Sequence, residues 1–439
     1  MLAALCVAAG CTHSVSKTAL TGDLPSLKAQ LAEAERKGEI DRDLTLGLAR
    51  AVLERELASL ADPITAFPET RSCAKQVQKS LERLAQGSGE AAELALLALM
   101  EAGLPVPSGS GAELLLAAHG AVGGPAGPRR RAFMLHADAA VRSAALWAAV
   151  DSRDAGDVAS LLEAARLDPD PGARVSALRA LGAIGGASVV LGLRDLWASV
   201  DAPRRSAIIL AWSSPACLES GGEAELTRLA ELSLDQHAVE AALVLERTEK
   251  GPPGLSTSVL GRALEGDDVS ARLRAVYAAP WSNAELRPSL ERAVQSADAA
   301  TRVLGLLRAI ENGTIDAAGI TELRKLAADP ALRSALVARV VLARAGDASV
   351  VVALRADLAA TPADQRTLAA LGLALLEQWP AAAHALADDS PRVRQVVACQ
   401  LLGAGDQTEP GTARLRARAF GPFAPEIATF LLAAVPAKN

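Results

Sequence analysis

The chain has 439 residues, of which 50% are hydrophobic and only 3% aromatic, so alanine, leucine and valine supply most of the apolar share. Strands favour β-branched and aromatic side chains, whereas alanine and leucine favour closely packed helices, so this composition excludes an all-β fold. The formal net charge of −6 lacks the basic excess that drives binding to nucleic acid. A chain this long exceeds one compact core, so we expect several domains or an elongated array.

The first eleven residues, MLAALCVAAGC, are apolar and end in small residues before Cys11. This pattern resembles the lipobox of bacterial lipoproteins, although Ala8 replaces the usual leucine and no lysine or arginine precedes Cys11. The resemblance implies a signal segment over 1–11, lipidation of Cys11, and attachment to a membrane of the cell envelope. By the same resemblance, Thr12 favours the outer membrane. The alternative is an uncleaved apolar N-terminus, which would place the protein in the cytoplasm.

Further along the chain, an aspartate followed four residues later by an arginine recurs at intervals of 30 to 32 residues, with one gap of 67. Each pair precedes a run of small and apolar residues at helical spacing, and several are preceded by a second amphipathic stretch. Two helices per ~30 residues predict a helical hairpin that becomes stable only when copies stack. The pairs are Asp138/Arg142, Asp170/Arg174, Asp201/Arg205, Asp268/Arg272, Asp298/Arg302 and Asp329/Arg333.

The gap of 67 contains a degenerate copy in which Val239 follows Asp235, and two later copies keep Arg366 and Arg394 without the aspartate. The segment DPGARVSALRALGAIG at 170–185 resembles the HEAT repeat, in the short form first noted in phycobilisome lyases. This resemblance covers roughly residues 128 to 405. It implies an all-α fold, an α-solenoid of stacked hairpins, but indicates little about function because such arrays serve unrelated roles.

The recurrent residues have a structural interpretation. An aspartate at the turn predicts an N-cap of the second helix of each hairpin, where it accepts hydrogen bonds from free backbone N–H groups. The arginine one turn later is expected to reach that aspartate or the aspartate of the next hairpin, so that a ladder of ion pairs fixes the stacking. The alternative is that the arginine row binds a ligand.

The rest of the chain is also expected to be helical. The N-terminal region, 12–127, contains four amphipathic helices, at 24–38, 42–62, 72–87 and 89–103, which are either degenerate repeats or a cap. The glycine-rich stretch 120–128 marks the boundary to the repeat array, 128–405. Residues 406–439 form a tail with a capping helix near 425–435.

Cysteine pairing is not expected in such an array. If Cys11 carries lipid, Cys73, Cys217 and Cys399 remain, and cysteines more than a hundred positions apart would lie several hairpins from one another. Cys73 and Cys399 therefore look like small buried apolar residues.

Signals of catalysis are sparse. The five histidines are scattered, and the sequence contains no Cys-x-x-Cys pair, phosphate-binding loop or nucleophile motif. We therefore expect no catalytic residue, metal or cofactor and no small-molecule substrate.

The five tryptophans stand out in a chain with few aromatic rings, and tryptophan is enriched where proteins bind partners. The alternative is that the rings fill gaps near the ends of hairpins. Two short basic clusters, 129–131 and 414–418, are candidates for contact with anionic lipid, or else exposed helix faces. The tryptophans are Trp147, Trp197, Trp212, Trp281 and Trp379.

These features together favour a non-catalytic scaffold, a lipid-anchored protein that binds a protein partner through its helical surface. Two alternatives remain open. One is a cytosolic regulatory scaffold of the same fold, and the other is an enzyme that acts on bilins, which is suggested only by the repeat subtype.

Overall fold

The computed structural model describes residues 15–59, 78–87, 90–107, 113–330, 332 and 334–405. Within these residues the regular structure is entirely helical, and no strand is present. The all-α prediction is therefore confirmed for the described part of the chain. Its cause is the composition, because helices rich in alanine and leucine pay little side-chain entropy and pack closely.

The described residues gather into two compact units. Unit 1 combines those of 1–108 with those of 296–439, and unit 2 comprises those of 109–295. These limits differ from the boundary expected near 127/128, which remains a prediction. We describe each unit by itself.

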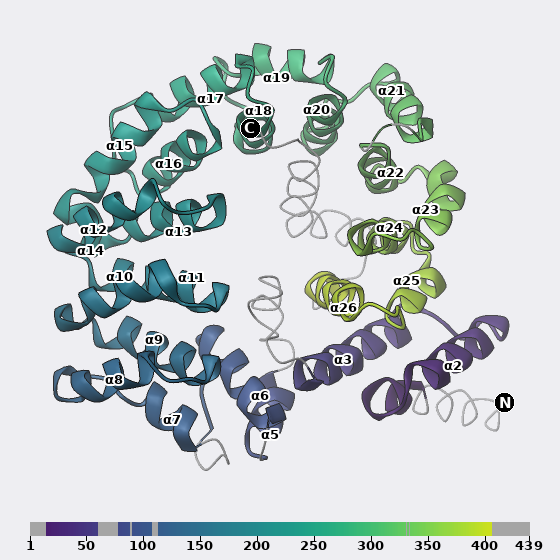
Figure 1. Cartoon of the computed structure of the whole chain (residues 1–439). Coiled ribbons are helices and arrows are strands. Elements are labelled where there is room, and N and C mark those ends of the chain that lie inside the picture. The colour runs from purple at the N-terminus through teal and green to yellow at the C-terminus, as the bar shows by residue number, and fades with distance from the viewer. Residues whose placement is uncertain are drawn as a thin grey trace. The chain divides into compact units, whose positions relative to one another are not determined.

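Unit 2 consists of helix pairs in two layers (Figure 1). We call the layers the first helices and the second helices, in the order in which each pair follows along the chain. The first helices are α8 (Gly127–Met134), α10 (Val158–Leu167), α12 (Ala187–Trp197), α15 (Glu223–Leu232), α17 (Leu255–Glu265) and α19 (Arg287–Val294). The second helices are α9 (Ala139–Ser152), α11 (Pro171–Ile184), α13 (Ala202–Trp212), α16 (Gln236–Arg247) and α18 (Val269–Ala278), each packed on the next.

Short elements complete unit 2. The helix α7 packs on α9, and it was not predicted, because its seven residues are too few to show a clear period. The short elements are α7 (Glu113–His119), η1 (Gly124–Ala126), η2 (Ala155–Asp157), α14 (Pro215–Cys217) and η3 (Leu218–Gly222).

Small side chains allow the second helices to approach one another. Ala177, Ala180 and Gly182 of α11 are buried. A Cβ atom built on Gly182 would lie 2.9 Å from the Cα atom of Ala211 in α13, which is closer than real Cβ contacts permit. The backbones of α11 and α13 therefore meet at a distance that only glycine tolerates without a shift of one helix.

Unit 1 contains helix pairs of the same kind (Figure 1). The helices α20, α22, α24 and α26 pack in that order as second helices, and α21, α23 and α25 pack on them as first helices. Their bounds are α20 (Ala299–Glu311), α21 (Ala317–Ala328), α22 (Ala335–Arg344), η4 (Ala348–Val350), α23 (Val351–Asp357), α24 (Ala363–Leu375), α25 (Trp379–Ala385) and α26 (Pro391–Gly405).

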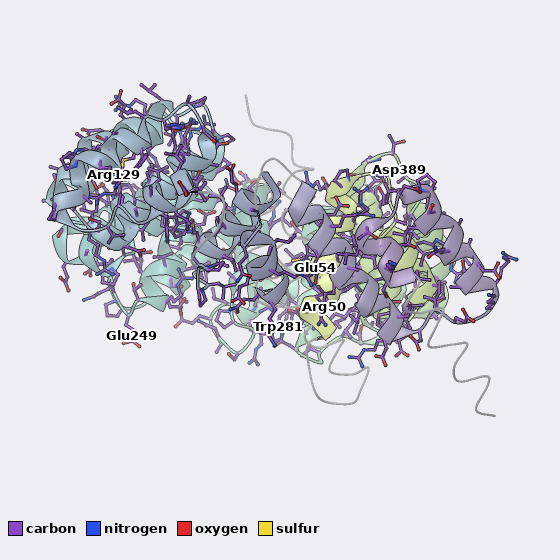
Figure 2. All side chains as sticks on the ribbon, turned by 90° about the horizontal axis from the view of Figure 1, so that it is seen from below. Arg50, Glu54, Arg129, Glu249, Trp281 and Asp389 are labelled. Atoms are coloured by element: carbon purple, nitrogen blue, oxygen red, sulfur yellow. The ribbon has the colours of Figure 1, made fainter. Side chains whose placement is uncertain are left out.

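The N-terminal helices of unit 1 continue this order. Helix α2 (Leu24–Arg36) packs on α25, and α3 (Arg42–Ser59) packs on α26. The pair α2–α3 thus takes the place of the next helix pair after α25–α26 (Figure 1). Next to it, α6 (Glu90–Glu101) packs on α3 and on α5 (Gln78–Ala85). Figure 2 labels Glu54 on α3 and Asp389 just before α26, on the two sides of the contact between α3 and α26.

The N-terminal helices agree with the prediction where the structure describes them. The expected segments 24–38, 42–62, 72–87 and 89–103 correspond to α2, α3, α5 and α6. The sequence did not indicate that α2 and α3 pack on the last helices of the chain. The helix expected near 425–435 and the basic cluster 414–418 lie outside the described residues.

Candidate functional site

The recurrent aspartates cap the second helices. In each case the residue before the helix is the aspartate, and its side chain accepts a hydrogen bond from a backbone N–H in the first turn. The caps are Asp138 of α9, Asp170 of α11, Asp201 of α13, Asp235 of α16, Asp268 of α18 and Asp298 of α20. Asp329 differs, since α22 begins after Ser334, and Arg333 lies outside the described residues.

The recurrent arginines bind the backbone of the preceding turn. The Nη1 group of Arg142 donates to the carbonyls of His136 and Ala137, both at 2.9 Å. Arg174 donates in the same way to the carbonyls of Asp168 and Pro169. These carbonyls lie in the turn that follows the first helix, so the arginine satisfies backbone acceptors of that turn and ties it to the second helix.

Four more arginines show the same role in whole or in part. Arg272 donates to a carbonyl six residues earlier, and Arg205 to one eight residues earlier. Arg366 and Arg394 each donate to the carbonyls six and five residues earlier, whereas Arg302 instead lies 3.4 Å from Glu322. For Arg142, Arg174 and Arg205 the hydrogen bonds described above go to carbonyls of the turn, and the nearby Asp170 and Asp138 add a smaller electrostatic effect that raises the pKa of Arg142. The pKa of Asp201 is lowered chiefly by Arg204 and to a smaller extent by Arg174 of the preceding hairpin, which is the other pairing that was expected. The ladder of aspartate and arginine pairs remains a prediction.

Three of these arginines also bind a carboxylate at two points. The Nε and Nη2 groups of Arg142 lie 2.9 Å from the two oxygens of Asp168, and Arg366 pairs with Asp388 at 2.7 and 2.9 Å. These hydrogen bonds raise the pKa of both arginines above the usual value. Each pair joins one helix pair to the next, and Asp168 is two residues away from the aspartate that was expected.

The third two-point pair joins the ends of the described chain. Nε and Nη2 of Arg394 in α26 lie 2.7 and 2.8 Å from the two oxygens of Glu56 in α3. Both side chains are buried. The contact between α2–α3 and α25–α26 also includes an exposed ion pair, Lys28–Asp389 at 2.6 Å, and a hydrogen bond between His384 and Glu35 at 2.8 Å. We call this contact the terminal clasp.

A buried ionic cluster lies near the start of unit 2. Arg130 is fully buried, its Nε lies 2.6 Å from Asp157, and its Nη2 lies 3.0 Å from Asp154. Its Nη1 donates to the carbonyls of Ala121 and Gly123. Contact of Arg130 with lipid is therefore contradicted, because this side chain holds the glycine-rich stretch in place. A run of arginines in sequence does not show which of them is buried.

Two of the five tryptophans meet in unit 2. The rings of Trp197 and Trp212 are stacked with centroids 5.6 Å apart, and the ring of His237 meets Trp197 edge-on at 5.5 Å. Trp212 is fully buried, and its indole N–H lies 3.4 Å from the carbonyl of Val190. The guanidinium of Arg205 lies over Trp197 at 5.6 Å. Because Trp212 is fully buried, its position agrees with the alternative that the rings fill gaps between helices.

Asp235 supports this cluster from the N-cap of α16. It accepts the backbone N–H of His237 at 2.9 Å, and its other oxygen lies 3.5 Å from the Nδ1 atom of the same histidine. Burial raises the pKa of the Asp235 carboxyl, but hydrogen bonds from His237 and Ser233 outweigh it, so the net pKa lies well below the usual range.

A different surface is formed where α9, α11 and α13 stand side by side. The guanidinium of Arg179 lies 4.8 Å from the ring centroid of Trp147, which is partly exposed. On the same helix as Arg179 and one turn earlier, Val175 is 39% exposed, and Leu210 of α13 is 58% exposed. We call Trp147, Val175, Arg179 and Leu210 the second-helix face.

A polar ladder adjoins this face. Ser206 of α13 donates a 2.7 Å hydrogen bond to Glu240 of α16, and Arg274 of α18 lies 2.7 Å from the other oxygen of Glu240. Each of the three side chains is on a second helix. The charges of Glu240 and Arg274 compensate one another, so this part of the surface is polar, whereas Val175 and Leu210 make the surface over α11 and α13 partly apolar.

The remaining tryptophans stand apart from these clusters. Trp281 follows α18 in a turn, and its carbonyl accepts a hydrogen bond from Arg287 at 3.4 Å. Trp379 is the first residue of α25 in unit 1. Figure 2 labels Trp281, which is partly exposed. Neither ring stacks on another ring or on a guanidinium among the described residues, and the sequence contained no signal that separates these two tryptophans from the other three.

One of the two cysteines among the described residues departs from the expected behaviour. Cys217 is free and buried, and burial raises the pKa of its thiol. Cys399 of α26 is disulfide-bonded, and its partner lies outside the described residues. The expectation that Cys399 stays unpaired was wrong. It assumed that cysteines far apart in sequence lie far apart in space, whereas α3 and α26 are distant in sequence and pack on each other. Cys11 and Cys73 lie outside the described residues.

The described residues contain few other groups with chemical potential. Among the described residues, no three or more histidine, cysteine or acidic side chains are grouped so that they could hold a metal ion. None of the helices in the described ranges has the length and apolar character needed to cross a membrane. No protein-family model and no curated protein matches the chain.

Proposed function

We propose that the protein is a non-catalytic scaffold, a HEAT-like α-solenoid that binds a protein partner through the second-helix face. The observation that carries the proposal is the partly exposed group of Trp147, Val175, Arg179 and Leu210 on three adjacent helices. Tryptophan and arginine are the residues most enriched where partners bind, and apolar neighbours add area that excludes water. Stacked helix pairs hold such a group rigidly.

The repeat identity has separate support. The helix pairs stack in two layers, the recurrent aspartates cap second helices, and the recurrent arginines bind the end of the first helix. These roles explain why the pattern D-x-x-x-R returns about every thirty residues. They are structural roles, so binding is assigned to the positions that differ between repeats.

The proposed location is the cell envelope, with a lipid on Cys11. The sequence around Cys11 is one support, and the disulfide at Cys399 is another, because structural disulfides persist in oxidising compartments and are rare in the cytosol. A cytosolic scaffold would have no evident use for that bond.

Lipidation is tested by growing cells with a fatty-acid analogue and measuring its incorporation into the protein. Wild type and Cys217→Ala are expected to incorporate the label equally, since Cys217 is buried. Cys11→Ala is expected to lose it. Equal incorporation into the Cys11→Ala protein would refute the anchor.

Partner binding is tested by placing a photo-crosslinking amino acid at position 210 and, as a control, at position 352 of unit 1, where the valine is 80% exposed. Irradiation of intact cells should give a discrete adduct from position 210 and none from position 352. Adducts of the same pattern from both positions, or none from either, would refute binding through this face.

A further inference from the structure

We infer that the lipidated protein rests unit 1 directly on the bilayer through the helical segment 15–21, which we call the seating segment. The partner of this surface is the headgroup layer of the bilayer. The inference rests on the proposed lipid on Cys11 and adds where the bilayer meets the protein. It is carried by the short length of chain between Cys11 and Val15, and by the contacts that fix the seating segment to α3.

Little chain separates the proposed anchor from folded structure. Val15 is four positions after Cys11, and it is already helical and 5% exposed. Four residues span at most about 14 Å, even when they are fully extended. The acyl chains lie in the hydrocarbon core, so Cys11 lies at the level of the headgroups. Val15 therefore stays within about 14 Å of the headgroups, little more than the diameter of one helix, which is roughly 10–12 Å.

The seating segment is fixed to α3 at two separate points. Ala19 is fully buried, and the Oγ atom of Ser16 lies 3.8 Å from the place that a Cβ atom on Gly47 of α3 would take. Just after the segment, the carbonyl of Gly22 accepts a hydrogen bond from Nη1 of Arg55 at 3.5 Å. The two α3 residues are eight positions apart, or about 12 Å along the helix. The segment is therefore part of the packed unit rather than a linker.

The contacts continue from the seating segment to the last described helix. Arg55 also lies 3.0 Å from Glu56, whose two oxygens bind Arg394 of α26. The segment passes into α2 through a short turn, in which the side chain of Asp23 caps α2. A lipid on Cys11 would therefore hold the terminal clasp close to the bilayer.

The exposed side of the seating segment suits anionic headgroups. Lys17 and Thr21 are exposed and lie one helical turn apart, on the side opposite to Val15 and Ala19, which are buried against α3. The stretch 15–22 contains a lysine and no aspartate or glutamate. A lysine held close to the membrane surface is attracted by anionic lipid. The bilayer is therefore expected to meet the side that carries Lys17 and Thr21.

The test uses the full-length lipidated protein in vesicles of phosphatidylethanolamine and phosphatidylglycerol. A fluorescent amino acid replaces Thr21, and added phosphatidylcholine with a nitroxide on its headgroup quenches fluorophores close to the bilayer surface. The matched control has the same fluorophore and an insert of about 20 glycine and serine residues between positions 14 and 15. Such an insert has a root-mean-square length of roughly 25 Å and leaves the packed residues unchanged. An insert of half that length provides an intermediate point.

Quenching at position 21 is expected to be at least threefold stronger without the insert than with the long insert, and the half-length insert should give a value between them. Lys17→Glu should lower the quenching at least twofold, because it reverses the charge that meets the anionic headgroups. Thermal unfolding and incorporation of the fatty-acid analogue, measured in parallel, should be the same for all four proteins.

Two results would overturn the inference: quenching without the insert that is no stronger than quenching with it, or quenching that Lys17→Glu leaves unchanged. If either occurs while all four proteins incorporate the fatty-acid label, the proposed anchor stands and only the seating on the bilayer is wrong. If none of them incorporates the label, the proposed anchor is wrong and the seating fails with it.

Discussion

Arg394 and Glu56 form a two-point ion pair although 338 positions separate them in the sequence. The arginine also donates to the carbonyls of Asp388 and Asp389, as Arg366 does to the equivalent carbonyls of the preceding turn. Glu56 therefore binds Arg394 of α26 in the same way as Asp388 binds Arg366 of α24. The same chemistry that joins successive helix pairs also joins the last pair to the N-terminal pair.

Removing one partner of this pair should be costly. Arg394→Met leaves the buried Glu56 carboxylate with Arg55, at 3.0 Å, as its remaining cation, and we expect the free energy of unfolding to fall by about 1–3 kcal/mol. Urea denaturation followed by circular dichroism measures the change. Lys28→Ala removes an exposed pair of the same clasp and should cost less than about 1 kcal/mol.

The double variant Arg394→Met with Glu56→Leu should recover part of that loss, since it removes the buried carboxylate that Arg394→Met leaves with fewer hydrogen bonds. Losses that simply add in the double variant would show that the two side chains do not interact.

The fold could be predicted further from the sequence than the site could. Local signals revealed the helices and the caps, because Asp170 and the helix that follows it are neighbours in the chain. The partner of Arg394 could not be predicted, because nothing local relates Glu56 to a turn more than three hundred residues away. The pairing of Cys399 was missed for the same reason.

The face around Trp147 was only partly visible in the sequence. The tryptophan stood out by its rarity, but Arg179 looked like any exposed helix residue, and Leu210 like any core leucine. Knowing which side of α13 is exposed requires the packing of its neighbours. By contrast, the repeat phase places Trp147, Arg179 and Leu210 at equivalent positions, and this register is a signal that could have grouped them.

Two glycines offer a matched test of helix packing. Gly182→Ala places a Cβ atom 2.9 Å from the backbone of Ala211, so one helix must shift, and we expect a loss of about 1–3 kcal/mol. Gly261→Ala in α17 meets only Leu286 at 3.7 Å, an ordinary contact, and the better helix propensity of alanine should stabilise the protein by up to about 1 kcal/mol. Thermal unfolding of both variants decides this, and equal effects would contradict the described packing.

The buried arginine of unit 2 can be compared with its exposed neighbour. Arg130→Met leaves the buried Asp157 with Arg131, at 2.8 Å, as its remaining cation and should lower the free energy of unfolding by about 1–3 kcal/mol. Arg129 is exposed and lies over the ring of Phe133, so Arg129→Met should cost less than about 1 kcal/mol. A neutral Arg130→Met would mean that this cluster does not stabilise unit 2.

His119 gives unit 2 a dependence on pH. Burial lowers the pKa of this histidine below its ordinary value near 6.5, and a smaller opposing effect comes from Asp151. The folded state therefore favours the neutral ring. Its contribution to stability is complete above about pH 6.5 and is lost as the pH falls towards the folded pKa, because protonation then favours the unfolded chain.

His119→Leu should abolish this contribution. Between pH 7.5 and 5.5, the melting temperature of wild type should fall more steeply than that of the variant. A variant with the same slope as wild type would assign the pH dependence to other groups.

The central structural claim is that α2–α3 completes the packing of α25–α26. Hydrogen exchange measured by mass spectrometry on the full chain and on a chain lacking residues 1–59 tests it most directly. We predict that amides in Pro391–Gly405 lose protection in the shortened chain, whereas those in Pro171–Ile184 of unit 2 keep theirs. Unchanged protection of Pro391–Gly405 would contradict the claim.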